Sequence, residues 1–76
     1  MQMQYKGLPV VAITIQDLYT VRCFYTANGS TQCDDVSLAP LGKAGAMQVL
    51  DFALATCTDE IAAAMITDAM KIVGVV

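Results

Sequence analysis

Few side chains in this sequence could perform chemistry, and histidine is not among them. The 76 residues contain no His, which removes the commonest general base and the commonest neutral metal ligand. A Cys/His or Ser/His nucleophile is therefore impossible within one chain. We predict that the protein is not an enzyme and that it needs no cofactor.

The three cysteines, Cys23, Cys33 and Cys57, are an odd number, which is simplest to explain in a reducing compartment. We interpret them as free thiols that behave as buried hydrophobic residues. Cys23 and Cys33 are predicted to project from opposite faces of a sheet, so they cannot form a disulfide within the domain.

Carboxylates are the most numerous charged groups. Asp34-Asp35 and Asp59-Glu60 lack the ligand number and the loop spacing of a calcium site, so no metal site is predicted. The net charge is −3. Acidic side chains would instead steer the protein toward a basic surface on another protein. The candidate partner-binding residues are Asp17, Asp34, Asp35, Asp51 and Asp68.

The segment Gly42-Lys43-Ala44-Gly45 has the G-x-x-G spacing with which KH domains clamp a nucleic-acid backbone. Four basic residues against seven acidic ones are unsuited to a polyphosphate. We therefore predict no direct contact with nucleic acid. A weaker alternative is a site for a single phosphate at the start of a helix, formed by Gly42, Lys43 and Gly45.

Asn28-Gly29-Ser30 reads both as a glycosylation sequon and as a hairpin turn. Asn-Gly between strand-forming residues is a strong signal for a two-residue type I′ turn. The N-terminal residues do not have the pattern of a signal peptide, and charged residues interrupt the apolar C-terminal third too often for a membrane span. We predict a turn in a soluble, cytoplasmic protein that does not contact membranes.

The elements that must position these groups form one domain over residues 1–76, with strands in about 1–37 and helices in about 43–73. Residues 8–15, 19–27 and 30–36 are predicted to form a three-stranded antiparallel meander. Either the first strand begins before Gly7 or a short extra strand precedes it. Two α-helices then pack on one face of the sheet, so the fold class is α+β.

Register can also be predicted. Gln16-Asp17 is assigned to the first turn, with Val11, Ile13 and Ile15 opposite Cys23, Val21 and Tyr19. In the second hairpin Arg22 lies opposite Asp35, and Cys23 lies opposite Asp34. Because this register turns Asp34 toward the apolar face, we expect a bulge or an early end of the third strand.

The polar side of the helical pattern moves after Thr58, which indicates two helices with a break at residues 56–58. Thr58 is the predicted N-cap, and Asp59 and Glu60 lie where the helix dipole favours negative charge. Residues 72–76 could continue the second helix or form a strand.

The chain is unusually apolar. Forty-five of its 76 residues are apolar when glycine is counted and tyrosine is not, or about 59% against a usual 45–50%. A chain this short buries only roughly 60% of its unfolded surface. We therefore expect a homodimer that covers part of this surface, with Met47, Met65, Ile66 and Met70 at the interface.

In its size, its negative charge and its lack of catalytic groups, the chain resembles the small acidic inhibitors that phages and other mobile elements make against host complexes, anti-CRISPR proteins among them. This resemblance is one of general character, and no residue is carried over. The leading prediction is a non-catalytic protein-binding homodimer, and the resemblance implies an inhibitor of this kind. The alternatives are a small-ligand-binding or sensory domain and a structural subunit of a larger assembly.

Overall fold

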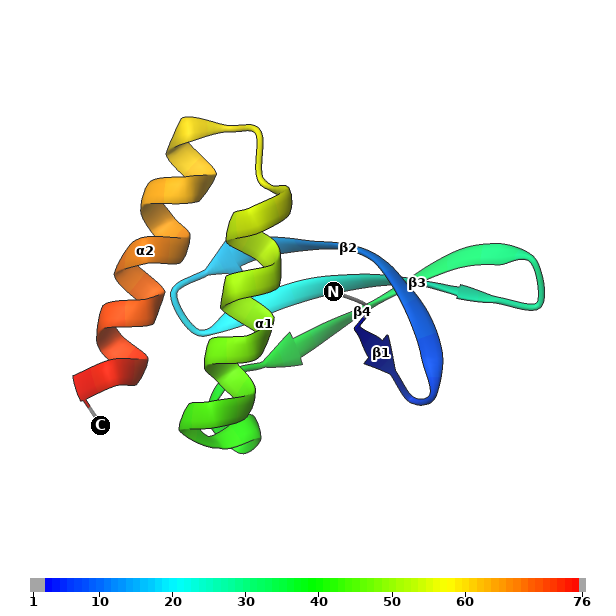
Figure 1. Ribbon diagram of the computed structural model, residues 1–76, viewed down its shortest axis with the longest axis horizontal. Helices are drawn as coiled ribbons and strands as arrows, with labels where there is room; N and C mark the ends of the chain where they lie inside the picture. Colours follow the sequence, from blue (N-terminus) through cyan, green and yellow to red (C-terminus); the bar gives the residue numbers. More distant parts are fainter. Residues whose placement is uncertain (1–2, 76) are drawn as a thin grey trace.

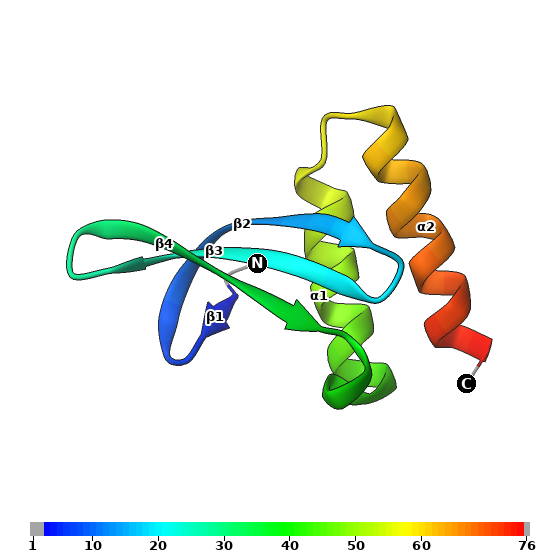
Figure 2. The same ribbon diagram turned by 180° about the vertical axis from the view of Figure 1, so that it is seen from behind.

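The computed structural model describes residues 3–75 and has an α+β fold (Figure 1). A four-stranded antiparallel sheet in the order β1-β2-β3-β4 is followed by two helices on one face, which confirms the predicted fold class. Figure 2 shows the opposite face of the sheet, which no helix covers. The elements are β1 (Gln4–Tyr5), β2 (Leu8–Asp17), β3 (Thr20–Ala27), β4 (Ser30–Ser37), a 3₁₀ turn η1 (Ala39–Leu41), α1 (Gly42–Thr56) and α2 (Glu60–Val75).

The sheet has four strands instead of the predicted three because β1 is a separate short strand. It pairs with β2, with Tyr5 opposite Leu8. Lys6 and Gly7, which connect the two strands, have φ values of 55° and 76°, as a tight two-residue turn requires. Of the two possibilities that the sequence leaves open, the short extra strand is the one observed.

The predicted register between β2 and β3 is wrong by two residues. Ile13 lies opposite Cys23, and the turn falls at residues 18–19 instead of at Gln16-Asp17. The Asp17 carboxylate accepts a hydrogen bond from the backbone N–H of Tyr19 at 2.8 Å, a local arrangement that favours a turn. Over residues 12–15 a shift of two residues leaves the side chains on their predicted faces. Val11, which was predicted on the apolar face, lies at an irregularity of the register and is 56% exposed.

The register of β3 and β4 is confirmed along its full length, from Ala27 opposite Ser30 to Thr20 opposite Ser37. Asn28 and Gly29 have φ values of 52° and 78°, which fits a type I′ turn. The predicted bulge or early end at Asp34 is wrong, because β4 continues past this residue to Ser37 with no irregularity.

The helix break is confirmed, but its cap is displaced by one residue. Asp59, not Thr58, accepts the hydrogen bond from the backbone N–H of Ala62 at 3.0 Å, as an N-cap residue does. Glu60 lies in the first turn of α2, where its charge suits the helix dipole. The helix extends to Val75, which settles residues 72–75, and Val76 lies outside the described residues.

The core lies between the helices and the sheet. Its largest fully buried side chains are Leu50 of α1, Ile66 of α2 and Val21 of β3. The connection of β3 and β4 extends away from the helices (Figure 1). Helices therefore cover one end of the sheet, and the other end must be held by other contacts.

Candidate functional site

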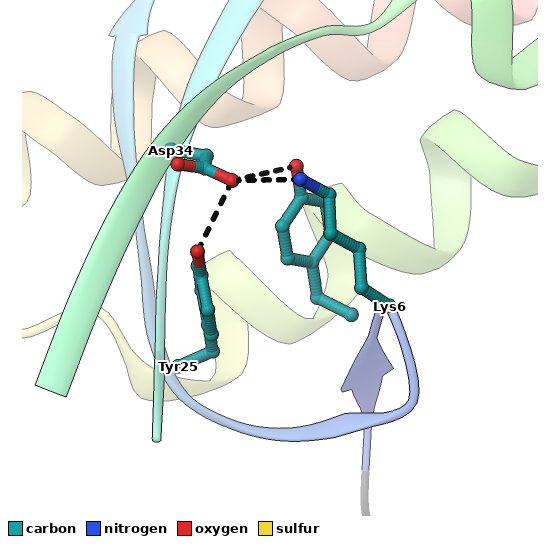
Figure 3. Close-up of polar contacts among 4 residues, drawn as sticks. Lys6, Tyr25 and Asp34 are labelled. Atoms are coloured by element: carbon teal, nitrogen blue, oxygen red, sulfur yellow. Dashed lines mark hydrogen bonds and ion pairs between the residues drawn. The ribbon is translucent and has the colours of Figure 1, made fainter. Parts of the chain in front are cut away.

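Asp34 lies at the centre of a polar cluster on the inner face of the sheet. Its Oδ2 atom accepts hydrogen bonds from the hydroxyl of Tyr5 at 3.1 Å, from the hydroxyl of Tyr25 at 3.3 Å and from Lys6 Nζ at 3.3 Å (Figure 3). The rings of Tyr5 and Tyr25 are 5.2 Å apart. These contacts fasten the hairpin formed by β1 and β2 to the β3–β4 hairpin.

The electrostatics of the cluster favour a charged Asp34. The hydrogen bond from Tyr5 is the main cause that lowers the pKa of Asp34, and Lys6 and Tyr25 act in the same direction. Burial and the Asp34 carboxylate raise the pKa values of both tyrosines, so their hydroxyls remain donors at neutral pH. The cluster is a satisfied structural contact with no nucleophile activated in it.

Replacing Asp34 with asparagine is expected to lower the melting temperature at pH 7, because the cluster loses its charged acceptor. The pKa of Asp34 is lower in the folded state than its ordinary value of 3.8. Its contribution to stability is therefore full above that value, and it is lost as the pH falls through the folded-state pKa. Thermal unfolding from pH 7 to pH 2 should show the two proteins converging below about pH 4.

Asp51→Asn is the control for this experiment, because Asp51 lies on the exposed surface of α1. A difference between wild type and Asp34→Asn that stays constant at all pH values would contradict the assigned role of the carboxylate. So would an equal loss of stability in the control.

Asp35 does not share a surface with Asp34, because adjacent residues of a strand face opposite sides. On the outer face Asp35 Oδ1 accepts a hydrogen bond from Arg22 Nε at 2.8 Å. This contact lowers the pKa of Asp35 and confirms the predicted cross-strand pair. The structure thus does not bring Asp34 and Asp35 together into one acidic patch.

The other candidate partner-binding residues differ in their contacts. Asp17 is engaged by the backbone N–H of Tyr19. Asp51 and Asp68 are exposed on α1 and α2, and within residues 3–75 neither takes part in a salt bridge. Of the five candidate partner-binding residues, Asp51 and Asp68 are the two whose carboxylates are available to another molecule.

The strand β4 forms one edge of the sheet. Ala27 and Ser30 flank a two-residue turn and therefore form a hydrogen-bonded pair. From this pair onward, non-hydrogen-bonded and hydrogen-bonded pairs alternate along β3 and β4. The backbone groups of Thr31, Cys33, Asp35 and Ser37 consequently point away from β3. In the described part of the chain no strand pairs with this side of β4.

The predicted oligomer interface needs one correction. Ile66 is only 1% exposed and belongs to the core, so it cannot contact a second chain in this fold. Met70 is partly buried against the same core. Met47 and Met65 are partly exposed, and their role at an interface stays a prediction.

The cysteines are free in this structure, but they are not all buried. Cys23 is buried, and burial raises the pKa of its thiol. Cys33 is exposed on the outer face, so the prediction of a buried thiol is wrong for this residue. The two do project from opposite faces, as predicted.

The predicted phosphate-binding segment borders a cavity of about 300 Å³ at the end of the sheet near the β2–β3 turn. Gly42 and Lys43 line this cavity, whereas Gly45 is not part of its lining. The first turn of α1 has no side-chain cap and no acidic residue. This leaves the positive end of the α1 dipole uncompensated by a side chain.

Comparison with known proteins found no match: no family model, no curated protein and no solved structure matches the chain. Within residues 3–75, no helix is both long and apolar enough to cross a membrane. The same residues contain no group of three or more His, Cys, Asp or Glu side chains arranged to hold a metal ion.

Proposed function

We propose that the protein is a non-catalytic homodimer that binds a basic surface of another protein. The observation that carries the proposal is the open edge of β4. An inhibitor of a host complex would act in this way, since it needs only to occupy a surface.

The edge of β4 is suited to pairing with another strand. Natural sheets usually protect their edges with charged side chains, especially lysine, with proline or bulges, or by keeping the edge strand short. β4 is eight residues long, contains neither lysine nor proline, and pairs with β3 without a bulge. Its two charged side chains, Asp34 and Asp35, are engaged by Tyr5 and Arg22 of the same chain. A second strand placed along it would satisfy the outward backbone groups by β-augmentation.

A second copy is the partner that we assign to this edge. When the β4 strands of two copies lie antiparallel, two registers allow their outward backbone groups to form hydrogen bonds along nearly the whole of both strands. The register centred on Asp34 places two carboxylates directly opposite each other, which is unfavourable. The register centred on Cys33 places Thr31 opposite the second copy's Asp35, and no like charges face each other directly.

The apolar content supports self-association. Forty-three residues are Ala, Val, Ile, Leu, Met, Phe, Tyr or Cys, and ten of those in the described part of the chain are buried. Apolar side chains such as Val11 are exposed in a single copy, which favours contact with another chain.

The negative charge of the chain supports the proposal of a basic partner. The chain carries a net charge of −3, and the carboxylates of Asp51 and Asp68 are exposed on the helices, away from the proposed dimer contact. Charges of this kind mainly raise the rate of association with a surface of opposite sign.

The dimer is tested by cross-linking at Cys33. In the proposed register the two Cys33 residues face each other across a hydrogen-bonded pair, with Cα atoms about 5.5 Å apart, which is within the range of a disulfide. Mild oxidation with oxidised glutathione should therefore give a disulfide-linked dimer on a non-reducing gel, and Cys33→Ser should abolish it. Sedimentation of the reduced protein at micromolar concentration should show the same dimer.

Moving the thiol provides the matched control. Ser37→Cys in the Cys33→Ser background keeps an exposed thiol on the same edge, but two copies of residue 37 would lie roughly 27 Å apart. This variant should not cross-link. Equal cross-linking at positions 33 and 37, or a monomer in sedimentation, would contradict the proposed pairing.

A further inference from the structure

The cavity beside the first turn of α1 is not used by the proposed function. Its walls come from the β2–β3 turn, η1, α1 and the last turns of α2. The apolar side chains that line it include Leu18, Leu38, Ala46, Ile72 and Val73. Its volume of about 300 Å³ lies at the lower limit of cavities that bind small molecules.

One positive charge borders these apolar walls. Lys43 lines the cavity, and it takes no part in the two salt bridges found within residues 3–75, which use Lys6 and Arg22. Asp17 precedes the cavity residue Leu18, but its carboxylate accepts the backbone N–H of Tyr19. The uncapped N-terminus of α1 adds positive potential at the same place.

Apolar walls with one lysine select against the single phosphate considered from the sequence. A free phosphate would lose water along the apolar side chains, and of the lining residues only Lys43 and Tyr19 have a polar side-chain group with which to replace it. An amphipathic anion avoids this cost, because its apolar part can occupy the cavity while its charged group stays beside Lys43.

We propose that this cavity binds a medium-chain aliphatic monocarboxylate. The aliphatic chain lies among Leu38, Ala46 and Val73, and the carboxylate accepts a hydrogen bond from Lys43 Nζ. This inference does not depend on the homodimer, because the lining residues described here belong to one chain.

Octanoate and its neutral analogue octanol are the probes, and binding is followed by amide chemical shifts in NMR titrations. Octanoate should shift the amides of Gly42, Ala46 and Val73. Lys43→Gln should weaken octanoate binding about five- to tenfold, the size of effect expected of a charge-assisted contact, and leave octanol binding unchanged. Lys71→Gln, which removes a lysine that does not line the cavity, should affect neither probe.

Ala46→Leu tests the volume of the cavity, because a larger side chain at this lining position should reduce the binding of both probes. If this variant does not fold, the comparison of octanoate with octanol in Lys43→Gln still decides. The proposal is overturned if millimolar octanoate leaves these amides unshifted. It is also overturned if Lys43→Gln weakens both probes equally, or if Lys71→Gln weakens octanoate as much as Lys43→Gln does.

Discussion

Proline in place of Cys33 is expected to convert the homodimer into a folded monomer. The N–H of Cys33 points away from β3, so its loss removes no hydrogen bond within the sheet, and proline is tolerated at such edge positions. In the proposed dimer, the two Cys33 residues exchange both of their backbone hydrogen bonds at the centre of the contact. Losing both, together with the bulk of two proline rings, should weaken dimerisation on the order of a hundredfold.

Sedimentation across a range of concentrations measures this change, and circular dichroism checks that the fold is retained. Cys33→Ser keeps the backbone donor and should remain a dimer. Gln32→Pro is the opposite control, because the N–H of Gln32 points toward β3 and its loss should destabilise the monomer itself. If Cys33→Pro still sediments as a dimer, the interface lies elsewhere on the molecule.

Neutralising the two exposed helix carboxylates is expected to slow binding to the basic partner. The double variant Asp51→Asn, Asp68→Asn should associate about tenfold more slowly at low salt, and its rate should depend less on ionic strength. The partner is first recovered on the immobilised dimer and identified by mass spectrometry, and association rates are then measured at several salt concentrations.

Glu60→Gln provides the comparison for this experiment, because it removes an exposed charge that is not among the candidate partner-binding residues. The double variant should lose more rate per removed charge than Glu60→Gln does. An equal loss per charge would show that net charge alone steers association, and Asp51 and Asp68 would then not be contact residues.

The β3–β4 hairpin could be predicted from local sequence signals. Asn28 and Gly29 fix a two-residue turn, and alternation of side chains then determines every pair from there to Ser37. The β2–β3 hairpin has no such signal. Irregularities near Val11 and Gln16 shift its register, and the Asx contact of Asp17 moves its turn.

The Asp34 cluster was half visible in the sequence. The predicted register placed Asp34 on the same face as Tyr25, so the apparent defect could have been read as a tyrosine–carboxylate contact. Tyr5 and Lys6 could not be predicted in the same way, because they reach Asp34 only when the short hairpin of β1 folds over the sheet.

Helix periodicity also has a physical limit. It groups Met65, Ile66 and Met70 on an apolar side of α2, but it does not say which part of that side faces the sheet. The cavity could not be predicted from the sequence, because its walls come from four segments whose packing against one another has no local sequence signal.

The position of the β3–β4 hairpin, beyond the helices, has a consequence for how two copies would engage a target. Each copy measures 38 × 26 × 21 Å along its principal axes, and antiparallel contact along β4 sends the two helical layers to opposite ends of the pair. Such a bivalent arrangement would present two identical acidic surfaces at a fixed spacing. A target with two matching sites would then be held by avidity, with the second contact made at high effective concentration.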